Sequence, residues 1–179
     1  SKAPETEILV MGTTGKGGVL EKLFGSISSM VSQKAHCPVW LVPPQVEFKG
    51  LQNLLYASNY QSADSDLMRH IVEFADEFTA NIHMVHVEES PWVGEYQLNE
   101  VLIEQLFRQK APALEFKMSV IRGSSVWESL YQYAEDHHID LIVLATRHRK
   151  FWENLLHTSI TKSMVLNART PLLVYHLDQ

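Results

Sequence analysis

Three glycines and a serine near the start of the chain lie in a segment that runs from a predicted strand through a loop into a predicted helix. They form the pattern G-x2-G-x9-G-S at Gly12, Gly15, Gly25 and Ser26. The pattern begins where an apolar segment, predicted to be a strand, ends, and it runs into a segment with helical spacing. A loop from a strand into a helix presents unpaired backbone N–H groups to an anion. Glycine allows such a loop to turn and lets a phosphate approach the backbone closely, so the pattern indicates anion binding.

A Walker-type loop is a competing interpretation of the segment GTTGKGG at 12–18. That motif, G-x4-G-K-[S/T], would need a glycine in place of Val10 and a serine or threonine in place of Gly17. Because neither is present, the spacing argues against the Walker interpretation. A structural alternative to anion binding stays open, in which the glycines only permit a tight loop.

The chain contains this segment twice, and the second copy has lost its glycines. Residues 8–42 align without a gap with residues 141–175, and each copy runs from an apolar strand through a helix to a strand led by proline. In the second copy the three glycines are replaced and the serine is kept, at Ala145, His148, Thr158 and Ser159. Side chains there would occupy space that phosphate needs, so this copy is predicted to keep the fold but not the site. The basic loop 147–150 could still attract an anion, although a solvated loop is the favoured interpretation.

Other residues that could do chemistry do not form a recognisable set. His83 and His86 stand three apart on a predicted strand, so they point to opposite faces and cannot share a metal. The adjacent carboxylates Glu88 and Glu89 are expected to be solvated. No Ser-His-Asp order or nucleophile elbow is present, and phosphoryl transfer would need a positioned base and usually Mg²⁺. We therefore expect no catalytic residue, no metal site and no enzymatic activity.

The composition is that of a globular soluble protein. Of 179 residues, 45% are hydrophobic and 20% are charged. No apolar run approaches the roughly 20 residues of a membrane helix, and residues 1–7 do not resemble a signal peptide. The net charge of −6 argues against nucleic acid as a main partner. The single cysteine, Cys37, is typical of a reducing compartment, so we expect a cytoplasmic protein without a membrane or nucleic-acid partner.

Apolar strands that alternate with amphipathic helices predict an α/β fold with a parallel sheet and helices on both faces. The expected strands are 7–12, 38–42, 53–57, 81–87, 115–122, 140–145 and 171–176. The expected helices are 20–34, 62–78, 99–110, 126–137 and 159–167. Ser124 and Ser125 are candidate N-caps, and the alternation within 115–122 favours an edge strand.

The order of these elements divides the chain into an incomplete part and a complete part. Residues 1–44 supply only a strand, a helix and a strand, residues 45–50 are interpreted as a linker, and residues 51–179 contain five strands in series. The first part lacks the strands beside which it would pack. We expect it to pack on the second part, on another copy of the chain or on residues outside it.

These features together resemble the universal stress proteins. The resemblance lies in the glycine pattern, in AHCPVWLV at 35–42 and in HVEES at 86–90, and it covers essentially the whole chain. It implies a tandem form: the C-terminal βαβ piece of one unit, then a complete identical unit. It further implies a doubly wound, flavodoxin-like sheet of five strands in the order 3-2-1-4-5. In that family the triphosphate and ribose of ATP would be lined by Gly12, Gly15, Gly25 and Ser26.

The chain departs from the family pattern at two places that concern the ligand. The adenine end of the family's pocket comes from the first two strands of a unit, and those strands of the first unit are absent here. In the second unit, Ser58 or Asn59 stands where the family usually has an aspartate. ATP binding is therefore expected of the first unit's motif, with the second unit mainly structural.

The resemblance also implies how the two parts join. Closing strands of two units pair antiparallel in this family, so we predict that Val39–Val42 pairs with Leu172–Tyr175. A homo-oligomer, or pairing with another stress-protein unit, would then cover the open edge of the first part. Two functional hypotheses follow: a stress-response protein that binds or senses ATP, and a dimerisation or partner-binding scaffold without nucleotide. A nucleotide-hydrolysing enzyme is the least supported hypothesis.

Overall fold

The computed structural model describes strands and helices in two compact units. The described residues are 8–13, 35, 37–44, 46–58, 65–88, 105, 107–146 and 170–176. One unit comprises residues 49–142, and the other comprises residues 1–48 together with 143–179. The described residues together show the α/β fold that the sequence predicts, with mostly parallel strand pairs.

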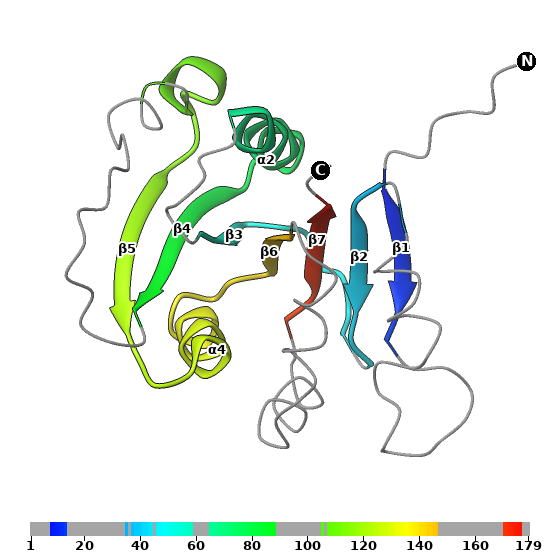
Figure 1. Ribbon diagram of the computed structural model, residues 1–179. Helices are drawn as coiled ribbons and strands as arrows, with labels where there is room; N and C mark the ends of the chain where they lie inside the picture. Colours follow the sequence, from blue (N-terminus) through cyan, green and yellow to red (C-terminus); the bar gives the residue numbers. More distant parts are fainter. Residues whose placement is uncertain are drawn as a thin grey trace, which may run out of the picture. The chain divides into compact units, whose positions relative to one another are not determined.

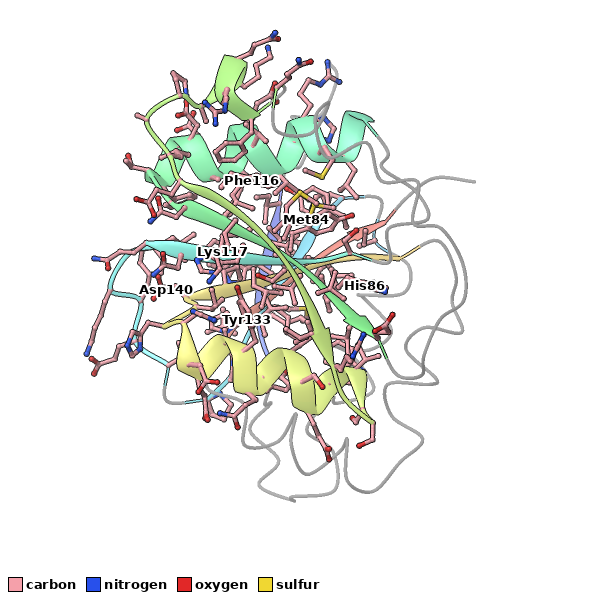
Figure 2. The ribbon with its side chains drawn as sticks, turned by 90° about the vertical axis from the view of Figure 1, so that its left-hand side faces the viewer. Met84, His86, Phe116, Lys117, Tyr133 and Asp140 are labelled. Carbon is pink, nitrogen blue, oxygen red and sulfur yellow. The ribbon has the colours of Figure 1, made fainter. Side chains whose placement is uncertain are left out.

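The unit of residues 49–142 is built on three parallel strands. Strand β3 (Asn53–Ala57) pairs with β4 (Asn81–Glu88), which pairs in turn with β5 (Phe116–Arg122). Helices α2 (Ser65–Phe78) and α4 (Val126–Asp136) cover opposite faces of these strands (Figure 2). Within the described part of the chain β5 has a strand neighbour on one side only, which confirms the predicted edge position.

Apolar side chains from both faces of these strands form the core of this unit. The sheet contributes residues that alternate between the two helices, because successive side chains of a strand point to opposite faces. Phe116 of β5 packs against Phe107 with 4.8 Å between ring centroids on the α2 side (Figure 2). Side chains exposed by at most 1% of their surface include Leu54, Leu55, Ile71, Ile82, Met84, Leu130, Leu141 and Ile142.

Helix α4 begins at the serine cap that the sequence predicts. Ser125 has extended backbone angles, φ −143° and ψ 121°, and its hydroxyl oxygen accepts a hydrogen bond from Glu128 N at 3.4 Å. This bond satisfies one of the N–H groups that the first turn leaves without an intrahelical partner. Of the two candidate serines, Ser125 is therefore the N-cap.

Helices α2 and α4 are each followed by a left-handed residue that is not glycine. Thr79 follows α2 with φ 56°, and His138 follows α4 with φ 51°. In each case the next residue closes the helix, through Ala80 N to Ala75 O at 2.9 Å and through Ile139 N to Ala134 O at 2.8 Å. The left-handed conformation is strained for a β-branched residue such as threonine.

Replacing Thr79 by glycine should therefore raise the free energy of unfolding by about 0.5–1 kcal/mol. Relief of left-handed strain of about 1–2 kcal/mol exceeds the extra chain entropy that glycine loses on folding. Urea denaturation measures the difference, and Thr79→Ala is the matched control because it keeps a Cβ atom. If the glycine variant is no more stable than the alanine variant, strain at this position does not limit stability.

The other unit joins strands from both ends of the chain. Strand β1 (Leu9–Gly12) pairs in parallel with β2 (Val39–Val42). Strand β2 pairs antiparallel with β7 (Leu172–His176), with Trp40 opposite Leu173. This register confirms the predicted pairing of the two closing strands (Figure 1). Strand β6 (Leu141–Thr146) begins in the first-described unit and ends in this one.

Several predicted elements lie outside the described residues. They are the helices 20–34 and 159–167, and the first part of the helix 99–110, of which residues 107–110 are described as helical. Strand β3 has the predicted bounds, and the predicted helix 62–78 is described from Ser65 to Phe78, while residues 62–64 lie outside the described residues. In the ranges that the structure describes, no helix has the length and apolarity required to span a membrane.

Candidate nucleotide site

The glycine loop starts at the carboxyl edge of the two parallel strands β1 and β2. Gly12 is the last residue of β1, is exposed, and lies opposite Val42 in the parallel register. The next residue, Thr13, is 8% exposed and donates its backbone N–H to Val42 O at 3.0 Å. The strand therefore ends in a fixed position, and the chain that follows leaves at the edge where parallel α/β folds bind ligands.

Of the four predicted ligand-lining residues, only Gly12 can be placed. Gly15, Gly25 and Ser26 lie outside the described residues. Met11, the neighbour of Gly12 in β1, pairs with Leu41 of β2, and the backbone of Leu9 donates to Pro38 O at 2.9 Å. These contacts hold β1 in register up to its last residue, which is the requirement for a loop that presents backbone N–H groups at a defined place.

The second copy of the motif differs at the corresponding strand end. Ala145 stands in β6 where the first copy has Gly12, and it is half-buried. Its methyl group narrows the space beside the backbone, whereas glycine leaves that space open. His148, Thr158 and Ser159 lie outside the described residues.

In the unit of residues 49–142, a serine and a histidine meet at the carboxyl ends of β3 and β4. Ser58, which is 9% exposed, donates its backbone N–H to Val85 O at 2.9 Å. Nδ1 of His86 lies 2.8 Å from Ser58 O. A carbonyl oxygen can only accept, so Nδ1 of His86 is the protonated nitrogen. Ser58 thus stands at this strand end without the carboxylate that the family resemblance implies for binding ribose or adenine.

An ion pair that the sequence did not suggest joins the ends of β4 and β5. Arg122 Nε lies 2.8 Å from Glu88 Oε2, and the side chain of Arg122 is 87% exposed. Glu88 is thus paired, contrary to the expectation that it is merely solvated. The parallel register places Glu88 opposite Arg122, and no pattern along either strand indicates that register. At such exposure an ion pair contributes about 0–1 kcal/mol.

The histidines of β4 do not act together. His86 contacts the Ser58 carbonyl, whereas Nδ1 of His83 lies 3.0 Å from the hydroxyl oxygen of Tyr133 in α4. Over the ranges that the structure describes, no group of three or more histidine, cysteine, aspartate or glutamate side chains could hold a metal ion.

The parallel strands and the helices α2 and α4 define an α/β protein with a mostly parallel sheet. Comparison with protein families identifies it more closely. The family model described as "Universal stress protein family" matches residues 2–43 and 51–176. The chain therefore belongs to the universal stress protein family.

Known relatives agree with this assignment. Universal stress protein Rv2623 of Mycobacterium tuberculosis is 24% identical over 182 residues, which cover 93% of this chain and 60% of the relative. Universal stress protein MJ0531 of Methanocaldococcus jannaschii is 47% identical over 38 residues, covering 21% of this chain and 22% of the relative. The match to this chain thus covers about 60% of the length of Rv2623.

Solved structures show the same fold. A universal stress protein from Archaeoglobus fulgidus superposes with a TM-score of 0.69 at 18% identity, over 95% of this chain and 60% of that one. A universal stress protein in complex with cAMP superposes with a TM-score of 0.50 at 13% identity, over 71% of this chain and 98% of that one. At these identities the likeness concerns the fold.

Proposed function

We propose that this universal stress protein takes part in the response to stress by binding or sensing ATP through the glycine motif of a first unit. In this proposal residues 1–44 end one unit, residues 45–50 link the units, and residues 51–179 form a complete second unit with the strand order 3-2-1-4-5. The second unit is mainly structural. The protein is cytoplasmic, works as a binding module rather than an enzyme, and pairs with another copy or another stress-protein unit.

The observation that carries the proposal is the position of Gly12. It is exposed at the carboxyl end of β1, directly before a loop with the glycine spacing of the family. ATP phosphates would lie against backbone N–H groups there, with Gly15, Gly25 and Ser26 completing the site. A similar fold is known in complex with cAMP, which supports an adenine nucleotide as the class of ligand.

Calorimetric titration with ATP tests the proposal on this chain beside a longer chain that carries a complete first unit. Binding by the longer chain alone is the expected result, because the adenine end of the site would come from strands that precede residue 1. Gly12→Val should weaken binding by the longer chain at least about tenfold. The control Ala145→Gly, at the matching position of the second copy, should leave it unchanged.

Two outcomes would contradict the proposal. Equal binding by both chains would mean that residues 51–179, or a site assembled between copies of the chain, hold the nucleotide. Absence of binding by either chain would favour the second candidate function, a scaffold for dimerisation or partner binding. That function is supported by the antiparallel pairing of β2 with β7, which joins strands from two copies of the repeated segment.

A further inference from the structure

A polar cluster lies between α4 and the sheet in the unit of residues 49–142. We name it the α4 histidine cluster, and its members are His83 of β4, Ser119 of β5, Tyr133 of α4 and His137 at the end of α4. The hydroxyl oxygen of Tyr133 lies 3.0 Å from His83 Nδ1 and 3.3 Å from Ser119 Oγ. The ring centroids of His83 and His137 are 5.4 Å apart, and those of Tyr133 and His137 are 4.1 Å apart.

Local structure explains why these residues meet. In the parallel register His83 lies opposite Lys117, and Ser119 is two residues further along the same face of β5. Tyr133 and His137 are four residues apart, so both face the sheet from one side of the helix end. Figure 2 shows Tyr133 on α4 below the sheet. Tyr133 is 7% exposed, so the cluster lies close to the core.

The charged groups around His83 come from several elements and are mostly positive. His137 faces it from the end of α4, Lys117 from β5, and Glu115 from the turn before β5. Burial lowers the pKa of His83 from 6.5, and the charges of His137 and Lys117 lower it further. The Glu115 carboxylate acts in the opposite direction. Across from His83, β3 presents Leu55, which carries no charge.

Protonation does not by itself break the hydrogen bonds of the cluster. Neutral His83 accepts the hydroxyl hydrogen of Tyr133, whereas the imidazolium donates to the same oxygen and Tyr133 then donates to Ser119. The penalty of protonation is therefore electrostatic. His83 is half-buried, and the charges of His137 and Lys117 beside it disfavour its imidazolium form, whereas separation of the helix end from the sheet would hydrate that form fully.

We propose that the α4 histidine cluster is an acid-sensitive latch, which holds the C-terminal half of α4 on the sheet while the His83 imidazole is neutral and releases it when His83 is protonated. The direction follows from linkage. Because the pKa of His83 is lowered in the folded state, its contribution to the free energy of unfolding is fully present above the unfolded pKa of 6.5. That contribution is lost as pH falls below 6.5 towards the folded value. The latch would make one helix of this unit responsive to mild acid.

Hydrogen exchange of the backbone amides tests the latch. Protection factors, corrected for intrinsic exchange, are compared at about pH 7.5 and about pH 5.5 for α4 and for α2. The amides of the last turns of α4 should lose protection by roughly threefold or more at the lower pH, while those of α2 change less. Equal loss in both helices would indicate general acid destabilisation and overturn the latch, as would unchanged protection of α4.

Variants separate the latch from packing. His83→Gln keeps a partner for Tyr133 without a titrating ring, and it should remove most of the pH dependence of α4 protection. His70→Gln is the matched control, since His70 is an exposed histidine of α2, and it should keep that dependence. If His83→Gln does not fold, His137→Gln decides, because it removes a neighbouring ring whose charge lowers the pKa of His83, and it should weaken the pH dependence of α4 protection. A full pH response in either cluster variant would overturn the proposal.

Discussion

Replacing Leu41 by alanine should lower the free energy of unfolding by about 2–5 kcal/mol. Leu41 is 0% exposed, and it lies in β2 between Met11 of β1 and Leu172 of β7. The truncation removes transfer free energy and leaves a cavity that strands on both sides can fill only partly. Because β2 is the strand that joins the start of the chain to its end in this unit, the loss should weaken both pairings at once.

Urea denaturation measures this effect, and hydrogen exchange of the β7 amides localises it. Val10→Ala is the matched control in the same unit, because Val10 is 59% exposed, and it should change stability by less than about 0.5 kcal/mol. A loss below about 1 kcal/mol for Leu41→Ala would mean that β2 is not a central strand of this unit.

Replacing Asp140 by alanine should cost about 2–3 kcal/mol. One carboxylate oxygen, Oδ2, accepts the backbone N–H groups of Gln52 at 2.7 Å and Asn53 at 3.0 Å, at the start of β3. Asp140 also donates its own N–H to Asn53 O at 2.8 Å. Asp140, the last residue before β6, thereby binds the backbone at the start of β3. Removal of its carboxylate leaves the N–H groups of Gln52 and Asn53 without this charged acceptor.

The network around Asp140 extends the expected effect to neighbouring strands. Asn53 Nδ2 donates to His138 O at 3.4 Å, and Asn81 Nδ2 donates to Asn53 Oδ1 at 3.3 Å. Asn81 Oδ1 in turn accepts the N–H of Glu115 at 3.0 Å. The amino ends of β3, β4 and β5 are thus joined by side chains as well as by the strand ladder. Loss of the carboxylate should loosen this end of the sheet first.

Thermal or urea unfolding checks this prediction against two variants. Asp140→Asn keeps an oxygen acceptor without the charge, so it should recover part of the loss. Asp136→Ala removes an exposed carboxylate whose hydrogen bond is to Gln132 Nε2, at 2.9 Å in the same helix, and it should change stability by less than about 0.5 kcal/mol. If the two alanine variants lose equal stability, the bonds to Gln52 and Asn53 contribute nothing specific.

Local patterns in the sequence were sufficient for most element boundaries. The apolar run at 53–57 has the bounds of β3, because a buried parallel strand is apolar throughout and ends at polar residues. Ser125 was recognisable as a cap because its hydroxyl satisfies a nearby N–H, an interaction that spans only three residues. The family resemblance supplied the pairing of β2 with β7, which no local pattern contains.

The candidate site could be predicted only in its residue types. Glycine spacing indicates where a loop can approach phosphate, and the structure places Gly12 at the carboxyl end of β1 as that loop requires. The pairing of Glu88 with Arg122 and the contact of His86 with the Ser58 carbonyl depended on the register of neighbouring strands. Register is fixed by packing across the whole sheet, so residue spacing along one strand does not reveal it.

By itself, the sequence determined the α/β fold class, the approximate positions of the described strands and of α2 and α4, and the presence of one intact and one degenerate glycine motif. These properties depend on hydrophobic periodicity and on the backbone freedom of single residues, which neighbours in the chain already specify. The tertiary structure alone decided that His83 meets Tyr133, 50 residues away, and that Asp140 binds Asn53, 87 residues away. The interior is closely packed, and the strands pair in a single register, so polar groups far apart in the sequence lie at fixed distances. Because buried polar groups need hydrogen-bond partners, these groups bind one another.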